Sequence, residues 1–480
     1  MAAGIRSQAM HFQARAGQQV RNLGLQRALQ KAKPLFVGKR AKGIASLVED
    51  GLDFGLLRST GKNARNRNLE DLDVWLDIFE ERATATGAEV LWARDGEEVS
   101  RLVVDIAQRH GVTKAVKSKS MLSEEAQLNE ALAAAGIRPV ETDLGEYIVQ
   151  LAGEAPSHII APAVHKTIGE VEALFAKEHG RPLEARTSAD IPAMAQEARA
   201  VLRQHFLSAE MGISGANFLI AETGSAALVT NEGNGRMVTT LPRIHVVITG
   251  IEKIVPTLDE FATLMRLLPR SATGQSISNY VSLLTGTKRE GDHDGPEKTI
   301  FILVDNGRAN LLGTPYEEML RCIRCGACMN HCPVYFSLGG HAYGWVYPGP
   351  MGSVLTPLFT GIENALDLPH ASTGCNQCGA VCPVEIPLPE LMHRLREEQN
   401  ERGLRPCSER LALKAWAWLA GKPTLYRWLT RRAARYLSWL ADDSGRIRVF
   451  GLAPAWTAGR DLPVSSGRTF HELYSARKKA

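Results

Sequence analysis

The sequence lacks any long hydrophobic run. Charged residues, glycines or prolines interrupt every apolar stretch before it reaches the ~18 residues that a membrane-spanning helix needs. Aromatic residues make up only 6% of the 480 residues and the formal net charge is only +4, so nothing in the composition favours nucleic acid as a partner. With 44% hydrophobic and 22% charged residues, the chain is neither disordered nor fibrous. We therefore expect a soluble or peripheral protein of two or three packed domains.

Acidic residues are missing from the start of the chain. Nine Lys and Arg residues, from Arg6 to Lys42, precede the first acidic residue, Glu49. This pattern is typical of an organellar transit peptide or of a basic amphipathic helix, and we favour a helix that ends at Lys33-Pro34. Residues 1–30 contain no continuous apolar core of the secretory type. We therefore expect a reducing, cytoplasmic location.

Helix and strand patterns alternate over residues 70–306. We predict helices at 71–85, 98–110, 123–135 and 191–206, and strands at 90–92, 115–116, 138–140, 217–221, 226–230, 244–249 and 299–304. Such alternation predicts an α/β domain with a largely parallel sheet. We divide the chain into a basic helical arm (1–69), this α/β domain (70–306), a cysteine-containing domain (307–403) and a basic, Trp-containing C-terminal domain (404–480).

The C-terminal domain differs from the rest of the chain in charge. Residues 405–480 contain fifteen Lys and Arg against five Asp and Glu. Four of its five tryptophans lie among basic residues in what we predict to be two short helices, which an irregular tail follows from Gly451. We favour packed helices here. Docking to a partner, or peripheral contact with the inner face of a membrane, is the alternative.

Cysteine is concentrated in one region, because seven of the eight cysteines lie between Cys322 and Cys382. The first four, Cys322, Cys325, Cys328 and Cys332, have the spacing C-x2-C-x2-C-x3-C-P of bacterial ferredoxins. A disulfide framework is disfavoured by the expected compartment and by the size of the chain. Zinc is disfavoured because seven cysteines are too many for one zinc and wrongly grouped for two. The pattern therefore predicts iron–sulfur clusters.

The fourth cysteine of such a motif ligates the other cluster in two-cluster proteins, which predicts a second motif. The second motif is Cys375, Cys378 and Cys382-Pro383. We accordingly predict two 4Fe-4S clusters, with the following ligands: Cys322, Cys325, Cys328 and Cys382 for cluster 1, and Cys332, Cys375 and Cys378 for cluster 2. The long spacing between Cys332 and Cys375 resembles that of the α-helical ferredoxin type found in electron-transfer subunits.

The second motif lacks its first cysteine, because Ser372 occupies that position. Ser372, Cys407, a histidine or water completes the cluster, or the corner stays open, or the cluster is of the 3Fe-4S type. We consider ligation by Cys407 the weaker option, because a lone cysteine in a helical segment is more often a small buried hydrophobic residue.

Three other segments are candidates for ligand binding. The small residues of 221–236 allow an anion to approach the backbone or form a tight strand connection, and we favour a surface pair over a ligand clamp for Glu222 and Arg236 within it. The stretch from Lys117 to Ser123 is either an anion-binding loop or a capped helix start. His341 either tunes a cluster by hydrogen bonding or satisfies a buried loop carbonyl, and we favour the carbonyl.

Several blocks of the chain together resemble the LutB-type lactate-utilisation iron–sulfur proteins. These blocks are Thr223-Gly224-Ser225, residues 241–245, 322–333, 339–344, Gly349-Pro350, 355–357, 375–383 and 470–474. The resemblance implies a LUD-type N-terminal domain with a fold akin to sugar-phosphate isomerases and CoA-transferases, an α-helical dicluster ferredoxin domain, and a short helical C-terminal domain. It also implies that the seven cysteines bind the clusters, and that two companion proteins, LutA-like and LutC-like, share in oxidising L-lactate to pyruvate.

On these grounds the sequence favours an electron-transfer subunit that connects lactate oxidation to a quinone or another carrier. No G-x-G-x-x-G follows a strand, so we place any flavin on a partner. One alternative makes the α/β domain itself the catalytic site for a 2-hydroxy acid, a CoA ester or a phosphate. Another makes the chain a scaffold or a redox-regulated binding protein. Neither the motifs nor the resemblance identifies a catalytic residue.

Overall fold

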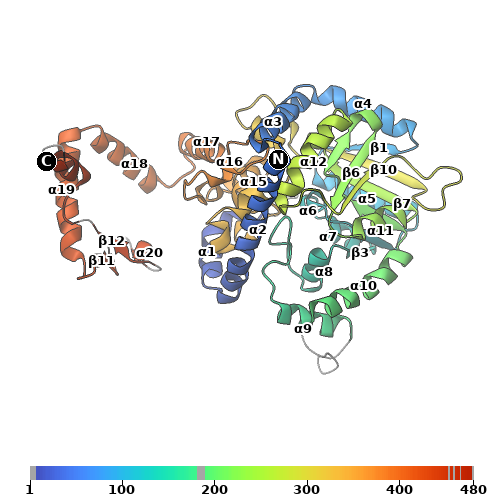
Figure 1. Ribbon diagram of the computed structural model, residues 1–480, viewed down its shortest axis with the longest axis horizontal. Coiled ribbons are helices and arrows are strands. Elements are labelled where there is room, and N and C mark those ends of the chain that lie inside the picture. The colour runs from blue at the N-terminus through green and yellow to red at the C-terminus, as the bar shows by residue number, and fades with distance from the viewer. Residues whose placement is uncertain (1–6, 181–189, 452–453, 458–459, 465, 478–480) are drawn as a thin grey trace. The chain divides into compact units, whose positions relative to one another are not determined.

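The computed structural model describes residues 7–180, 190–451, 454–457, 460–464 and 466–477 (Figure 1). The chain forms two compact units, residues 1–399 and residues 400–480. Residues 1–6 of the basic arm and residues 478–480 of the C-terminal domain lie outside the described residues. The two units are described separately below.

A six-stranded parallel sheet is the centre of the first unit. In spatial order its strands are β1 (Glu89–Ala93), β10 (Lys298–Val304), β7 (Ile244–Gly250), β4 (Met211–Ser214), β2 (Lys114–Lys117) and β3 (Arg138–Glu141). All seven residues of β7 are buried, as expected for a parallel strand that helices cover on both faces. The predicted α/β class with a parallel sheet is therefore confirmed.

Helices of the predicted period surround this sheet. They are α4 (Leu72–Ala85), α5 (Gly96–Arg109), α6 (Met121–Glu125), α7 (Leu128–Ala134), α8 (Leu144–Leu151), α9 (Ile168–Glu178), α10 (Ile191–Ser208), α11 (Asn234–Thr240) and α12 (Leu258–Ala272). The single helix predicted at 123–135 is wrong, because Gln127 adopts a left-handed conformation between α6 and α7. Ser100 of α5 donates a 2.7 Å hydrogen bond to the carbonyl of Ala126, which compensates for the end of α6.

A second, four-stranded sheet lies beside the first. Its strands, in spatial order, are β8 (Ile254–Val255), β5 (Phe218–Ile220), β6 (Ser225–Thr230) and β9 (Tyr280–Leu284). β5 and β6 form an antiparallel hairpin, and β9 pairs antiparallel with β6. Helix α4 packs between the two sheets, where Phe79 meets Phe301 of β10 at a ring distance of 5.2 Å. The α/β region therefore combines a parallel and a mixed sheet.

The basic N-terminal residues form three helices, α1 (Phe12–Val20), α2 (Leu23–Glu49) and α3 (Phe54–Glu70) (Figure 1). The predicted helix end at Lys33-Pro34 is wrong, because α2 continues through Pro34. A proline inside a helix removes one hydrogen bond, but contacts on both sides of Pro34 hold the helix in place. Lys33 lies over the ring of Phe336, and Phe36 stacks on His158.

The cysteine-containing segment consists of short helices in the first unit. They are the 3-10 helix η6 (Glu317–Arg321) and the α-helices α13 (Ala327–Asn330), α14 (Tyr335–Leu338), α15 (Gly349–Thr360), α16 (Gln377–Ala380) and α17 (Leu388–Glu401). Helix α2 contacts α13 and α14 on one side and α12 of the α/β region on the other. The basic arm thus connects the cysteine-containing segment to the α/β region.

The second unit contains the predicted pair of helices, α18 (Cys407–Ala420) and α19 (Pro423–Leu440). It also contains β11 (Arg446–Ile447), α20 (Pro454–Thr457), β12 (Leu462–Pro463) and α21 (Phe470–Arg477). Arg431 of α19 and Glu472 of α21 form a 3.2 Å ion pair. Across the described residues of both units, every helix is too short or too polar to cross a membrane.

Candidate iron–sulfur centres and an adjoining cavity

Four cysteine side chains from distant parts of the segment meet at one place. Cys322, Cys325, Cys328 and Cys382 line a small cavity together with apolar side chains that include Met319, Met351 and Ile386. These cysteines are the four that the sequence assigns to cluster 1. Cys325 and Cys382 are buried, and Cys322 and Cys328 are partly buried. Four thiols around an apolar cavity are a suitable set of ligands for one cubane.

The surroundings of these thiols fit a bound cluster better than free thiols. Burial raises the pKa of the Cys382 thiol to about 11 and raises the pKa of Cys325 further. At neutral pH such thiols ionise only when a metal compensates for the lost hydration. The backbone N–H of Ile386 donates to Cys382 Sγ at 3.3 Å, the type of bond that stabilises cluster ligands. The residues present therefore fit an iron–sulfur cluster.

Basic side chains from three parts of the chain surround this first group. Arg40 of α2 donates to the carbonyl of Val381 at 3.0 Å, and Arg58 of α3 donates to the carbonyl of Cys382 at 2.9 Å. Lys253, which follows β7, donates to the carbonyl of Cys322 at 3.3 Å. These bonds hold the backbone at both ends of the cysteine set, and they place positive charge where thiolates and a cluster carry negative charge.

The remaining three cysteines of the segment form a second group. Cys332 and Cys378 are buried, Cys375 is exposed, and the charge of Cys332 would interact with that of both Cys375 and Cys378. The two motifs also share a backbone turn. Gly326 and Asn376 occupy equivalent places, each in a left-handed conformation just before a short helix. The three cysteines of this second group are those that the sequence assigns to cluster 2.

The residue that completes the second group stays a prediction. Ser372 Oγ accepts a 3.1 Å hydrogen bond from the backbone N–H of Gly374, within an exposed loop. Cys407 begins α18 in the second unit and is exposed, so the interpretation of Cys407 as a small buried residue is wrong. The apolar periodicity of the sequence did not indicate that Cys407 is exposed. Among the described residues, the helices of the second unit contain no buried residue.

A larger cavity of about 290 Å³ lies at the carboxyl ends of the parallel strands. Ser118 and Lys119 follow β2, Gly215 follows β4, Thr249 and Gly250 end β7, and Arg308 comes after β10; all of them line it. Ligands of open parallel sheets bind at this edge, because the loops after the strands converge there. We call this space the carboxyl-edge cavity.

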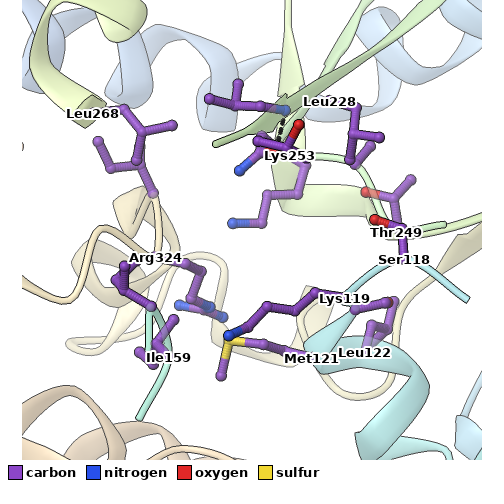
Figure 2. Close-up of a pocket in the computed structure, with 18 of the residues that line it drawn as sticks. Ser118, Lys119, Met121, Leu122, Ile159, Leu228, Thr249, Lys253, Leu268 and Arg324 are labelled. Carbon is purple, nitrogen blue, oxygen red and sulfur yellow. Dashed lines mark hydrogen bonds between the residues drawn. The ribbon is translucent and has the colours of Figure 1, made fainter. Parts of the chain in front are cut away.

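Cationic side chains reach into the carboxyl-edge cavity from separate loops. Figure 2 shows the side chains of Lys119, Lys253 and Arg324 pointing into one space, with Thr249 and Ser118 on another side. Burial, together with the neighbouring Arg324, lowers the pKa of Lys253 to about 7. Apolar side chains, among them Ile159, Leu228 and Leu268, complete the wall. Of the polar residues named here, the sequence singled out only the stretch of Lys119.

A buried network of ion pairs and hydrogen bonds lies beside this cavity. Arg308 donates to Glu125 and to Glu252, each at 2.8 Å, and Tyr347 donates to Glu125. Burial alone would raise the pKa of Glu252, but Arg308 and the neighbouring cations hold it at about 2. Arg324 Nη2 lies 3.6 Å from Glu252 Oε1. The network joins the α/β region to the cysteine-containing segment through Tyr347 and through Arg324, whose side chain is 12% exposed.

Part of the candidate stretch 221–236 does line the carboxyl-edge cavity, through Leu228 to Glu232 and Asn234, whereas its first residues do not. Residues 221–236 include the tight β5–β6 connection, in which Gly224 has a φ of 62° and a Cβ would lie 2.3 Å from the backbone of Ala83. Glu222 accepts from the backbone N–H of Leu258, and Arg236 lies over Tyr280, so these two residues form neither a clamp nor the expected surface pair. Lys119 does line a cavity, while Ser120 also caps α6.

His341 bonds a loop carbonyl, as the sequence favoured, but this carbonyl belongs to an exposed residue rather than a buried one. The Nε2 of His341 donates to the carbonyl of Ala155 at 2.7 Å. His341 also lies with Glu154 and His165 in a group whose ligand atoms lie within 4.8 Å of one another. However, Glu154 binds both His165 and Lys166, and His165 also bonds Ser157, so these groups already satisfy one another without a metal ion.

Comparison with known proteins places three family models along the chain. A LUD domain model matches residues 76–304, a 4Fe-4S dicluster domain model matches residues 318–386, and a model described as "Lactate utilisation protein B, C-terminal" matches residues 392–479. The three matches follow one another in chain order and together cover the α/β region, both cysteine motifs and most of the second unit.

Similar proteins occur in several bacteria. A lactate utilization protein B of Lysinibacillus sphaericus is 42% identical over 98% of this chain and 97% of its own length. A protein of the same name from Bacillus subtilis is 43% identical over 88% of each chain. An uncharacterized electron transport protein, YkgF, of Escherichia coli is 39% identical over 98% of this chain and 97% of its own.

One solved structure also matches part of the chain. It is a DUF162 family protein from Deinococcus radiodurans, 18% identical, with a TM-score of 0.25 over 49% of this chain and 98% of that one. A similarity this weak supports no conclusion about the fold.

Proposed function

The chain belongs to the lactate utilization protein B family, and we propose that it is an iron–sulfur electron-transfer subunit of a complex that oxidises L-lactate to pyruvate. The resemblance inferred from the sequence is thereby confirmed at the level of the family, and the chain contains a 4Fe-4S dicluster domain. The single observation that carries the proposal is the convergence of Cys322, Cys325, Cys328 and Cys382 on one cavity.

We assign the ligands as the motifs predict. Cys322, Cys325, Cys328 and Cys382 hold cluster 1, and Cys332, Cys375 and Cys378 hold three corners of cluster 2. Clusters of this kind supply one-electron transfer when bound. The protein excludes water from the first site with apolar side chains, and it fixes the cysteine backbone through Arg58 and Lys253.

The two cysteine groups differ in exposure, and this difference indicates which of them exchanges electrons with another protein. The first group is enclosed by protein and adjoins the α/β region, whereas Cys375 of the second group is exposed. Electron exchange with another protein requires close approach to a cluster. We therefore assign the second group as the end that meets a redox partner, and the loop around Ser372 as part of that docking surface.

The partners follow from the family assignment. We propose LutA-like and LutC-like companion subunits in a cytoplasmic complex, with a quinone or another carrier as the final acceptor. The C-terminal unit is our candidate for docking, because its tryptophans 416, 418, 428 and 439 are each 49–75% exposed among basic residues. Contact of this unit with the inner face of the membrane is the other outcome to be tested.

Iron and sulfide analysis with low-temperature EPR of anaerobically purified protein tests the proposal. We expect about eight irons, with signals of interacting reduced clusters after dithionite. About seven irons and a 3Fe-4S signal would instead place an open corner at Ser372. Zinc in place of iron would exclude electron transfer by this chain.

A matched pair of substitutions tests the ligand assignment. We expect Cys382→Ser to lose the signals of cluster 1 and about half of the iron, because Cys382 closes the first group. Cys407→Ser is the comparison, because Cys407 is exposed and belongs to neither cysteine motif. Equal iron loss in the two variants would contradict the assignment.

A further inference from the structure

The carboxyl-edge cavity contains two buried polar groups that make no hydrogen bond within the protein. Lys119 Nζ forms a 3.4 Å ion pair with Glu146 Oε1 but no hydrogen bond. Thr249 is only 2% exposed, and its hydroxyl also has no partner. Buried polar groups in folded proteins are nearly always hydrogen-bonded. Donors of this kind therefore indicate that a bound ligand or water supplies the missing acceptors.

The cationic side chains of the cavity favour a negatively charged ligand. Lys119, Lys253 and Arg324 extend into the same space (Figure 2). The acidic residues of the lining already have donors in the protein, because Glu252 binds Arg308, Asp143 accepts from the backbone N–H of Gly145, and Glu232 accepts from that of Leu144. Thiolates at Cys322 balance part of this positive charge, because Lys253 and Arg324 adjoin that cysteine. The thiolate of Cys322 provides no acceptor for Lys119, which lies in the loop after β2, or for Thr249, which lies at the end of β7.

We propose that the carboxyl-edge cavity binds a small 2-hydroxy or 2-oxo monocarboxylic acid. The carboxylate faces the cationic ends of Lys119, Lys253 and Arg324, and the oxygen on the second carbon faces the hydroxyl of Thr249. The wall formed by Ile159, Leu228 and Leu268 takes the alkyl end. The proposal rests on the proposed function for the choice of L-lactate and pyruvate as the acids to test.

The position of this cavity connects the acid to the first cysteine group. Ile323 and Arg324 line both the carboxyl-edge cavity and the small cavity of Cys322, Cys325, Cys328 and Cys382. An acid in the cavity therefore lies across a single layer of residues from cluster 1. Its negative charge beside Arg324 changes the electrostatic environment of that cluster, so binding has a spectroscopic signature apart from any turnover.

Calorimetric titration of the anaerobically purified, cluster-containing protein with L-lactate, pyruvate and inorganic phosphate tests the proposal. We expect saturable binding of at least one of the two acids at a single site and weaker binding of phosphate. We also expect the EPR signal of reduced cluster 1 to change shape on addition of the acid that binds. Tighter binding of phosphate than of either acid would overturn the assignment of ligand class.

Two substitutions in the cavity and one outside it locate the site. We expect Lys119→Gln to weaken binding of the acid about tenfold or more, because it removes a charged hydrogen-bond donor. Thr249→Val should weaken binding about threefold or more but leave the stability of the ligand-free protein equal or higher, because the lost hydroxyl has no protein partner. Lys177→Gln, on a side chain that is 79% exposed, should bind as the unsubstituted protein does.

The outcomes separate this proposal from the proposed function. Normal iron content and EPR signals without binding of either acid would overturn the cavity assignment and leave electron transfer standing. Absence of clusters would overturn electron transfer, whereas binding of the acid that depends on Lys119 and Thr249 would still support the cavity. Binding that neither substitution weakens would place the acid elsewhere and reject the assignment.

Discussion

His245 is a buried histidine in the middle of the parallel sheet. It is 1% exposed, and its Nε2 lies 2.8 Å from Ser214 Oγ. Burial lowers the pKa of His245 to about 4, whereas an unfolded histidine titrates near 6.5. Between these two values the unfolded chain binds a proton that the folded chain does not. The free energy of unfolding therefore falls as the pH decreases from about 6.5 toward 4.

We expect His245→Gln to reduce this sensitivity to acid. The loss of stability between pH 8 and pH 5 should be smaller by about 2 kcal/mol, because the glutamine takes up no proton in either state. Urea unfolding midpoints at the two pH values measure the difference. His393→Gln is the control, since the His393 side chain is 67% exposed. The same acid sensitivity in His245→Gln and the unsubstituted protein would refute the argument.

The residues that the sequence could identify differ in kind from those it could not. The spacing of Cys322, Cys325 and Cys328 is a local constraint, so the pattern alone indicated their chemistry. Lys117 and Lys119 looked alike, yet Lys117 forms a buried pair with Glu141 at 2.6 Å and Lys119 enters the cavity. Lys253 gave no local signal at all, because its role depends on a cysteine far along the chain.

Helix α3 is the element that joins the α/β region to the cysteine-containing segment. Arg65 is 1% exposed and donates to the carbonyls of Ile254 in β8 and Leu320 in η6, at 2.9 and 3.0 Å. Arg58, two turns earlier, bonds the carbonyl of Cys382. One helix thus fixes the strand beside the cavity and the two ends of the first cysteine group.

We expect Arg58→Gln to make cluster 1 more labile. The substitution removes a charged donor to the Cys382 carbonyl, so the rate of iron release to a chelator should rise about two- to tenfold. Arg67→Gln on the same helix is the control, because Arg67 pairs with Glu260 and its side chain is 59% exposed. Absorbance loss of the clusters in the presence of the chelator gives the rates. Equal rates for the two variants would show that Arg58 plays no part.

The periodicity of apolar residues predicted helices and strands correctly where local conformational preference and tertiary packing favour the same structure. The strand at 244–249 and the helix at 191–206 were found because long apolar patterns mark them. Pro34 did not end α2, because contacts with the cysteine-containing segment outweigh its missing hydrogen bond. Strand β4, only four residues long and containing a glycine, carried too little pattern to be recognised.

At the scale of the whole molecule, all seven clustered cysteines lie in the first unit. The arm, the α/β region and the cysteine-containing segment share buried charges and backbone bonds across one continuous interior. The C-terminal unit supplies none of the cysteines of either group. The sequence anticipated a distinct basic tail from its composition, but composition could not show how closely the remaining regions depend on one another.

We expect a chain that ends after residue 404, which keeps α17 whole, to retain its clusters. Iron content and EPR signals should match those of the full chain, because both cysteine groups and their basic neighbours remain. Loss of association with companion subunits, measured by co-purification, would then assign docking to the removed unit. Loss of iron on truncation would instead mean that the C-terminal unit, and Cys407 within it, contributes to cluster 2.

The bonds from the arm to Val381 and Cys382 also impose an order on biosynthesis. The arm is synthesised before the cysteine-containing segment, but Arg40 and Arg58 find their acceptors only after Cys382 has been synthesised. Until then Arg40 and Arg58 of the nascent chain lack their carbonyl acceptors, and the set of cysteines for cluster 1 is incomplete. We therefore expect cluster 1 to be completed only after residue 382 has been synthesised, and a fusion partner at the N-terminus that delays docking of the arm to lower the iron content of the purified protein.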